Sequence, residues 1–174
     1  MINILLDSYV RYLVTINIKI KMDIGRGCGY PASSLSNFAP HPFVIDGVEC
    51  ASMEGFLQSL KFASPDIQVE VCKLVGYAAK KRGASKNWRE SQTLWWRGVA
   101  YDRKGKDYQN LLDRAYEELS KNEGFRSALL ATRDANLTHS IGKSKKNDTI
   151  LTRSEFCSRL MKLRDKIKSE NETE

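Results

Sequence analysis

The feature that most constrains this chain is a succession of segments in which apolar residues recur at helical spacing. The clearest segment, "TRSEFCSRLMKLRDKIK", covers residues 152–168 and opens with Thr152-x-x-Glu155, the spacing of a capping box. Its apolar face is formed by Phe156, Leu160, Leu163 and Ile167. A chain built mainly from such segments must pack helices against one another, because an isolated helix cannot bury its apolar face.

The same spacing predicts further helices, which start near Ser52 and over residues 65–83, 107–122 and 125–132. Strand signals are fewer. Asp46-Gly47 lies between two short apolar runs and predicts a two-residue hairpin. Residues 10–21 alternate apolar and polar side chains, which is typical of a strand. The pattern predicts an α+β fold that is mostly helical with a small hairpin or sheet.

A length of 174 residues is most simply one domain. We expect the domain to span residues 22–168, because a second methionine, Met22, precedes the helical segments. Residues 1–21 are then an N-terminal extension, which is either a strand or the product of an upstream start codon, and residues 169–174 are a frayed tail.

The basic charge of the chain is localised. Residues 80–106 carry nine Lys and Arg against Glu90 and Asp102, and this balance of +7 equals that of the whole chain. Such a segment favours partners that bear phosphates, including nucleic acid, although a solvated basic face has the same composition.

The four cysteines are widely spaced and form no CxxC pair, and the chain has only two histidines. We therefore expect no metal site, no disulfide framework and no cofactor, and we interpret the thiols as reduced side chains of a cytoplasmic protein. No apolar run is long enough to predict a membrane span.

The segment "ASMEGFLQSLKF" at residues 51–62 has a polar stripe beside its apolar face. Glu54, Gln58 and Lys61 fall at i, i+4 and i+7 of one helix. A carboxylate can act as a base, an amide can orient a hydroxyl and an ammonium can hold a phosphate. By spacing alone the stripe is ordinary helix surface.

Three stretches change this interpretation: "LSNFAPHPFVIDGVECASMEGFLQSLKF" at 35–62, "KNW" at 86–88 and "FRSALLATRDANLTHS" at 125–140. In this order they resemble the motifs of the NADAR superfamily, which includes the YbiA-type N-glycosidases. The resemblance runs from about residue 22 to residue 167.

The resemblance implies a hydrolase that cleaves the bond between a ribose C1 and a nitrogen. Substrate classes in the family are ribosylamino-pyrimidine phosphates of riboflavin synthesis and ADP-ribose attached to guanine. The family's catalytic glutamate falls on Glu54. The residues that match its binding positions are Asn37, Phe38, Gln58, Lys61 and Trp88. Trp88 is expected to stack on the base, although a tryptophan also serves as a core residue.

The chain departs from the family pattern at two places. The histidine after the glutamate is Gly55, and the later Trp-Gly-Asp-Gly segment, which carries a second acid, is replaced by "HSIGKSKKNDTILT". Asp148 or Asp134 is a candidate for the missing acid. His139 and Lys143, in this replacing loop and its approach, either grip a pyrophosphate or form a surface turn.

Three functions remain open at this point: an N-glycosidase acting on a phosphorylated N-riboside or ADP-ribosyl adduct, a noncatalytic ADP-ribose or NAD binding module, and a nucleic-acid-binding protein that uses residues 80–106. The sequence indicates no oligomeric state.

Overall fold

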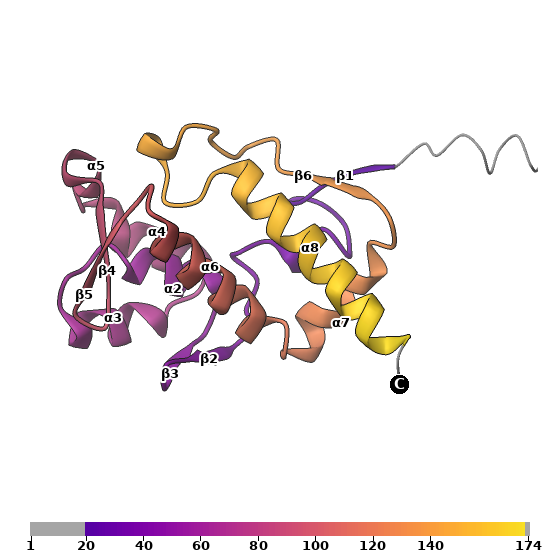
Figure 1. The fold of residues 1–174 in the computed structure, drawn as a ribbon, viewed down its shortest axis with the longest axis horizontal. Helices are drawn as coiled ribbons and strands as arrows, with labels where there is room; N and C mark the ends of the chain where they lie inside the picture. Colours follow the sequence, from indigo (N-terminus) through magenta and orange to yellow (C-terminus); the bar gives the residue numbers. More distant parts are fainter. Residues whose placement is uncertain (1–19, 173–174) are drawn as a thin grey trace, which may run out of the picture.

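The computed structural model describes residues 20–172 (Figure 1). The helices are α2 (Met53–Ser59), α3 (Pro65–Cys72), α4 (Gly76–Ala84), α5 (Trp88–Ser91), α6 (Lys106–Leu119), α7 (Glu123–Ala131) and α8 (Arg153–Asn171), with short 3-10 turns η1 (Ser33–Leu35) and η2 (Lys146–Asp148). The strands are β1 (Lys21–Asp23), β2 (Phe43–Ile45), β3 (Val48–Cys50), β4 (Thr93–Trp96), β5 (Val99–Asp102) and β6 (Asn136–Thr138). The predicted α+β, mostly helical fold is confirmed.

The strands form three separate pairs within the described residues. The predicted hairpin is β2–β3, whose turn places Asp46 at φ 49° and Gly47 at φ 77°, as a two-residue turn with two positive φ values requires. A second hairpin, β4–β5, turns at Arg97 and Gly98 and was not predicted. The third pair joins β1 and β6 in parallel, although more than 110 residues separate them.

The single helix predicted over residues 65–83 is wrong. The chain breaks between α3 and α4, where Gly76 has φ 55°. The carbonyls released at the break bond elsewhere: Cys72 O accepts from Ala51 N at 2.8 Å, and Leu74 O accepts from Ser52 Oγ at 3.0 Å. These tertiary hydrogen bonds compensate for the interrupted helix, which the apolar spacing does not reveal.

The predicted N-terminal boundary falls inside a strand. β1 begins at Lys21, and Ile20 O accepts from Asn136 N at 2.8 Å, so the residues just before Met22 belong to the β1–β6 pair. Residues 10–19 of the predicted strand lie outside the described residues. At the other end α8 continues to Asn171, beyond the predicted start of the frayed tail.

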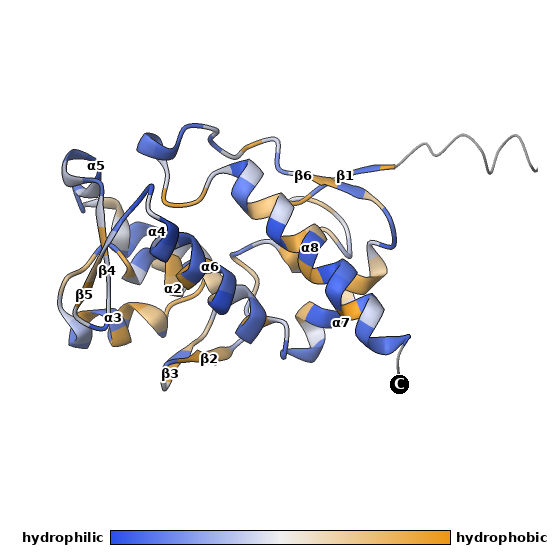
Figure 2. Ribbon diagram, viewed as in Figure 1, coloured by the Kyte–Doolittle hydropathy of each residue, from blue (hydrophilic) through white to orange (hydrophobic). Residues whose placement is uncertain are grey.

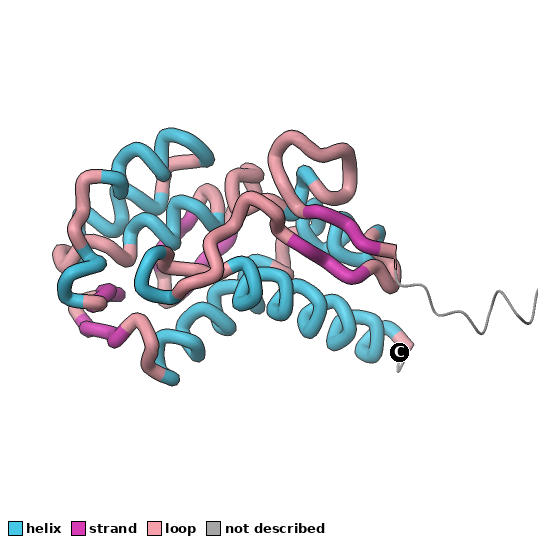
Figure 3. Tube along the Cα trace, turned by 90° about the horizontal axis from the view of Figure 1, so that it is seen from above, coloured by secondary structure: helices cyan, strands magenta, loops and turns pink. Residues whose placement is uncertain are grey.

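The elements are arranged along one long axis. Figure 1 shows α2–α5 with β4–β5 at one end and α7, β1 and β6 at the other, with α6 between them and α8 running obliquely across the second end. Figure 3 shows the β1–β6 pair beside this long helix, and α8 packs on β6.

The apolar side chains of these elements form one core, and Figure 2 shows hydrophilic and hydrophobic residues alternating along α6 and α8. At the end that holds α2, the ring of Phe56 lies 5.0 Å from that of Trp96, which is 2% exposed. Trp96 therefore belongs to the core, and its neighbour Trp95 is half-buried. The core fixes α2 between the two hairpins and the α3–α4 pair.

Candidate active site

Helix α2 is buried along its whole length. Ser52 caps it, with its Oγ accepting from Gly55 N at 3.0 Å. Glu54 is 7% exposed and Gln58 is 6% exposed, while Lys61, just beyond the helix, is half-buried. The interpretation of this stripe as ordinary solvated surface is thus wrong, because α3 and α4 pack against α2.

Glu54 and Gln58 form a buried pair one helical turn apart. Gln58 Nε2 donates to Glu54 Oε1 at 2.8 Å. Burial raises the pKa of Glu54, and the hydrogen bond from Gln58 and the charges of Lys80 and Lys61 act in the opposite direction. Among the described residues no cation lies within 4.0 Å of the Glu54 carboxylate. It is therefore a buried acid held by one neutral donor.

Lys80 and Lys61 lie near this acid, and Arg89 lies near Lys61. Burial lowers the pKa of Lys61 to about 8; the charge of Glu54 opposes this effect, and the charges of Arg89 and Lys80 add to it. Lys61 Nζ has one hydrogen bond in the described structure, a long one of 3.4 Å to Gly83 O. Lys61, Lys80 and Arg89 together outweigh the single carboxylate of Glu54, and this excess of positive charge suits an anionic ligand.

The "SNF" loop contacts the start of α2. Asn37 O accepts from Glu54 N at 2.9 Å, and Asn37 Oδ1 accepts from the hydroxyl of Tyr116 at 2.8 Å. The ring of Phe38 lies 5.7 Å from Lys80 Nζ. We call Glu54, Gln58 and Lys61, with the nearby Lys80 and Arg89, the Glu54 cluster. The structure places Asn37 and Phe38 beside this cluster, as the motif predicts. It adds Tyr116, which no sequence signal indicated.

Two glycines shape the same site. A Cβ on Gly55 would lie 2.6 Å from Leu74 O and 2.9 Å from Cys72 O, so the present backbone has no room for a side chain at this position. This accounts for glycine where the family has histidine: the α3–α4 break occupies the space. A Cβ on Gly83 would clash with Gln58 Oε1, a buried atom that has no hydrogen-bond partner among residues 20–172.

Trp88 belongs to the hydrophobic core and is 4% exposed. The Arg89 guanidinium lies over its ring at 5.5 Å. In this state the indole packs into the core, and its stacking on a substrate base stays a prediction.

The loop that replaces the Trp-Gly-Asp-Gly segment is held by four donors: one in α5, one in α6 and one just after each of α5 and β5. They bind four successive carbonyls: Gln92 Nε2 donates to Asn147 O at 3.2 Å, Arg89 to Asp148 O at 3.3 Å, Arg103 Nε to Thr149 O at 2.8 Å and the Tyr108 hydroxyl to Ile150 O at 2.7 Å. Asp148 is thereby held to Arg89 through its backbone carbonyl, and its side chain is exposed.

The other candidate acid lies elsewhere. Asp134 forms an ion pair of 2.7 Å with Lys168, near the end of α8 and at the end of the molecule opposite α2 (Figure 1). The prediction that Asp134 serves as the second acid is therefore wrong for this arrangement, since β6 and the following loop separate it from the Glu54 cluster. Asp148 remains the candidate.

His139 and Lys143 have structural contacts. His139 Nδ1 lies 2.7 Å from Ile24 O, and its ring meets that of Phe156 edge-on at 5.3 Å. Lys143 O accepts from Arg153 N at 2.9 Å, and its side chain is exposed. No contact joins either residue to the Glu54 cluster in the described structure, so their role in binding pyrophosphate stays a prediction.

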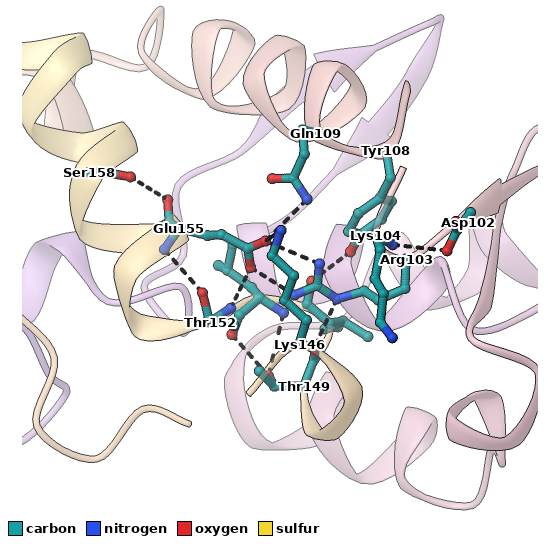
Figure 4. Close-up of polar contacts among 12 residues, drawn as sticks. Asp102, Arg103, Lys104, Tyr108, Gln109, Lys146, Thr149, Thr152, Glu155 and Ser158 are labelled. Atoms are coloured by element: carbon teal, nitrogen blue, oxygen red, sulfur yellow. Dashed lines mark hydrogen bonds and ion pairs between the residues drawn. The ribbon is translucent and has the colours of Figure 1, made fainter. Parts of the chain in front are cut away.

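Arg103 belongs to a different cluster (Figure 4). It is fully buried and donates to both oxygens of Glu155, at 3.1 and 2.7 Å. Burial alone would raise the pKa of Glu155, but the hydrogen bonds from Arg103 and Thr152 and the charge of Arg103 bring it to about 2. The expectation that Arg103, within residues 80–106, contributes to a phosphate-binding face is wrong, because Glu155 neutralises its charge inside the fold.

Two cavities lie outside the Glu54 cluster. One, of about 450 Å³, lies between α6 and α8 and is lined by Tyr116, Glu155, Arg159 and Lys162 among others. The other, of about 400 Å³, lies between β5 and α6. Tyr116 connects the first cavity to the "SNF" loop through its bond to Asn37.

The described residues offer neither a metal-binding cluster nor a membrane-spanning helix. Between Ile20 and Glu172 no three His, Cys, Asp or Glu side chains gather in a way that would hold a metal ion. No helix of this region combines the length and the apolarity that crossing a membrane requires.

Comparison with known proteins identifies the family of this chain. The profile of the family described as Bacteriophage protein GP30.3 matches residues 29–165. The chain belongs to the GP30.3 family. The chain is similar to the uncharacterized 17.1 kDa protein of the Gp30–rIII intergenic region of Enterobacteria phage T4. The two sequences are 39% identical over 150 residues, which cover 84% of this chain and 99% of the T4 protein.

The fold of this GP30.3 family member is that of a solved bacterial protein. The NMR structure of the E. coli protein YbiA superposes with a TM-score of 0.59 at 18% identity, over 89% of this chain and 92% of YbiA. The predicted resemblance to YbiA-like proteins of the NADAR superfamily is confirmed at the level of the fold.

Proposed function

We propose that this GP30.3 family protein is an N-glycosidase that hydrolyses the ribose C1–N bond of a phosphorylated N-riboside or an ADP-ribosyl adduct. The observation that carries the proposal is the buried Glu54, which is held by one neutral donor, Gln58, and lies within the field of Lys61 and Lys80. An acid without a close counterion keeps its charge available for a substrate, whereas a paired acid does not.

The chemistry requires a carboxylate at this place. As the C1–N bond breaks, its electron pair leaves with the base nitrogen, and positive charge develops on C1 and the ring oxygen. Ionised Glu54 stabilises this charge and takes a proton from the water that adds to C1. The proton that Glu54 takes balances the one that the departing base nitrogen gains, so the net reaction adds one water across the C1–N bond.

The neighbouring groups fit the remaining parts of such a substrate. Lys61, Lys80 and Arg89 supply positive charge for a phosphate. The unpartnered Gln58 Oε1 and the amide nitrogen of Asn37 are an acceptor and a donor suited to ribose hydroxyls. Trp88 is proposed to stack on the base and Asp148 to supply the second acid.

The decisive experiment measures products by mass spectrometry from a panel of ribosylamino-pyrimidine phosphate, NAD and ADP-ribosylated DNA. We expect cleavage of at least one substrate, and we expect Glu54→Gln to lower its turnover roughly 100- to 10,000-fold with the fold intact. Glu70→Gln makes the same change on an exposed acid of α3 and should leave turnover unaltered. Wild-type turnover by a folded Glu54→Gln protein would disprove the mechanism.

The pH profile gives an independent check. Because burial raises the pKa of Glu54, kcat/KM should fall on the acid side at a pH above the ordinary glutamate pKa of 4.5. A limb at or below the ordinary value would show that another group is the base.

A noncatalytic ADP-ribose or NAD binding module is the second candidate. Glycine at position 55 and the replaced Trp-Gly-Asp-Gly segment favour it, because both remove groups that the catalytic family pattern contains. Calorimetric binding of ADP-ribose by the wild type, together with no product from any substrate of the panel, would establish this alternative. The cytoplasmic location stays a prediction.

A further inference from the structure

Two cationic segments that are distant in sequence meet beside the Glu54 cluster. The first runs through α4 and α5, and the second is the loop that leads into η2. Arg89 donates to Asp148 O and Gln92 donates to Asn147 O, so the two segments are in direct contact. We call the combined cations the basic surface: Lys80, Lys81, Arg82, Lys86, Arg89, Lys143, Lys145 and Lys146, all of them exposed. Figure 2 shows α5 and the η2 segment as hydrophilic neighbours.

Little of this charge is neutralised within the fold. Over the described part of the chain, one of the eight cations has a carboxylate within 4.0 Å: Lys146, which lies 3.8 Å from Glu155. That carboxylate already receives two hydrogen bonds from Arg103. Arg82 and Lys86 lie over the ring of Phe62, at 4.7 and 4.8 Å, which orders their side chains without removing their charge.

An exposed aromatic ring interrupts the basic surface. Tyr77 is 68% exposed in the first turn of α4, three and four residues before Lys80 and Lys81 on the same helix. The adjacent Gly76 packs on Phe38 of the "SNF" loop. Exposed aromatic rings among cations are typical of surfaces that bind single-stranded nucleic acid, where bases stack and phosphates follow the charges.

The depth of the candidate site favours a single strand over a duplex. Glu54 is 7% exposed, so an adducted nucleotide must leave the base stack to bring its ribose to the carboxylate. A flexible strand presents unstacked bases, whereas a duplex must first be opened.

We propose that the basic surface, with Tyr77 as a stacking platform, binds single-stranded nucleic acid and delivers it to the Glu54 cluster. The delivery step rests on the proposed function, but the binding does not. The surface differs from residues 80–106 as predicted from the sequence: it excludes the buried Arg103 and gains the loop with Lys143 and Lys145.

The test is fluorescence anisotropy with an unmodified 12-nucleotide strand and the matching duplex, titrated at several salt concentrations from about 50 to 200 mM. The variant carries Lys81→Gln, Lys86→Gln, Lys143→Gln and Lys145→Gln, and it keeps Lys80 and Arg89, which act on the Glu54 cluster. We expect weaker binding of the single strand. The slope of log K against log salt concentration should become flatter by up to about 0.7 for each lost phosphate contact.

A matched control separates the surface from net charge. Lys73→Gln, Lys121→Gln, Lys162→Gln and Lys166→Gln remove the same charge from α3, α6 and α8 and should leave affinity nearly unchanged. Tyr77→Ala should weaken strand binding roughly 5- to 100-fold, and Tyr77→Phe should retain it.

Three results would overturn the proposal: no strand binding at 50 mM salt, equal losses in both lysine quartets, or a duplex that binds as tightly as the strand. The two proposals fail separately. Cleavage of a small phosphorylated riboside without strand binding removes the surface alone, whereas strand binding without turnover of any panel substrate removes the glycosidase alone.

Discussion

The buried Glu54 and the largely buried Glu155 have opposite environments. Glu155 receives a bidentate pair from Arg103 and a 2.8 Å hydrogen bond from Thr152 N, and its pKa falls to about 2. Glu54 has one neutral donor, and its pKa rises. Both carboxylates are largely shielded from solvent and have positive groups nearby, so neither property distinguishes them. The difference is whether a cation contacts the carboxylate directly.

The difference separates a structural acid from a candidate catalytic one. The Arg103–Glu155 pair joins β5 to the N-terminus of α8, and Arg103 also holds Thr149 O in the loop before α8 (Figure 4). Its hydrogen-bonding capacity is used within the fold. In the described part of the chain, Gln58 Oε1 of the Glu54 cluster has no hydrogen-bond donor, and the Lys61 amine has one long hydrogen bond. Both groups therefore keep hydrogen-bonding capacity that the fold does not use.

The largest expected effect comes from breaking the structural pair. Arg103→Met leaves the mostly buried Glu155 with only the more distant Lys146 as a counterion, at 3.8 Å, and should lower the free energy of unfolding by roughly 3–5 kcal/mol. Chemical denaturation measures this. Lys104→Met, at the exposed neighbouring position, should change the free energy by less than about 0.5 kcal/mol. Equal effects of the two changes would show that the pair contributes nothing specific.

The second effect is the acid sensitivity of the same pair. Because the pKa of Glu155 is about 2 in the folded protein and 4.5 ordinarily, the unfolded chain binds more protons between these values. The stabilisation is complete above pH 4.5 and is lost as the pH falls towards 2, by an amount on the order of 2–3 kcal/mol. Melting curves of the wild type and Glu155→Gln should show a steep acid decline in the former and a shallower one in the latter.

The smallest effect has the opposite sign and belongs to Glu54. Its raised pKa means that the folded protein binds the proton more tightly, so ionisation above the ordinary pKa costs stability. Between pH 5 and pH 8 the stability of Glu54→Gln relative to the wild type should therefore increase, while Glu155→Gln shows no such trend. A constant difference across this range would mean that Glu54 titrates normally and would remove the contrast between the two acids.

Much of the local structure was predictable from short stretches. The capping box at Thr152 and Glu155 and the Asp46-Gly47 turn are both present, since each depends on hydrogen bonds and dihedral angles within a few residues. The β4–β5 hairpin was missed because its turn is Arg97-Gly98, and arginine is an unusual residue at a positive φ. The break between α3 and α4 was missed because distant donors, Ala51 N and Ser52 Oγ, compensate for it.

The candidate site divides in the same way. Glu54, Gln58 and Lys61 fall on one side of α2 and its extension because of helical spacing, and the motif places Asn37 and Phe38 next to them. Lys80, Arg89 and Tyr116 join the cluster through packing of α4, α5 and α6, and no spacing rule connects these helices to α2.

The sequence by itself determined most of the helices, the first hairpin, the overall basicity and the position of the motif glutamate, because these follow from spacing, composition and local hydrogen bonding. The tertiary structure alone decided which acid is paired and which is not. A cation neutralises a carboxylate only across a few ångströms, and whether Arg103 or Lys61 covers that distance depends on how helices far apart in the chain pack together.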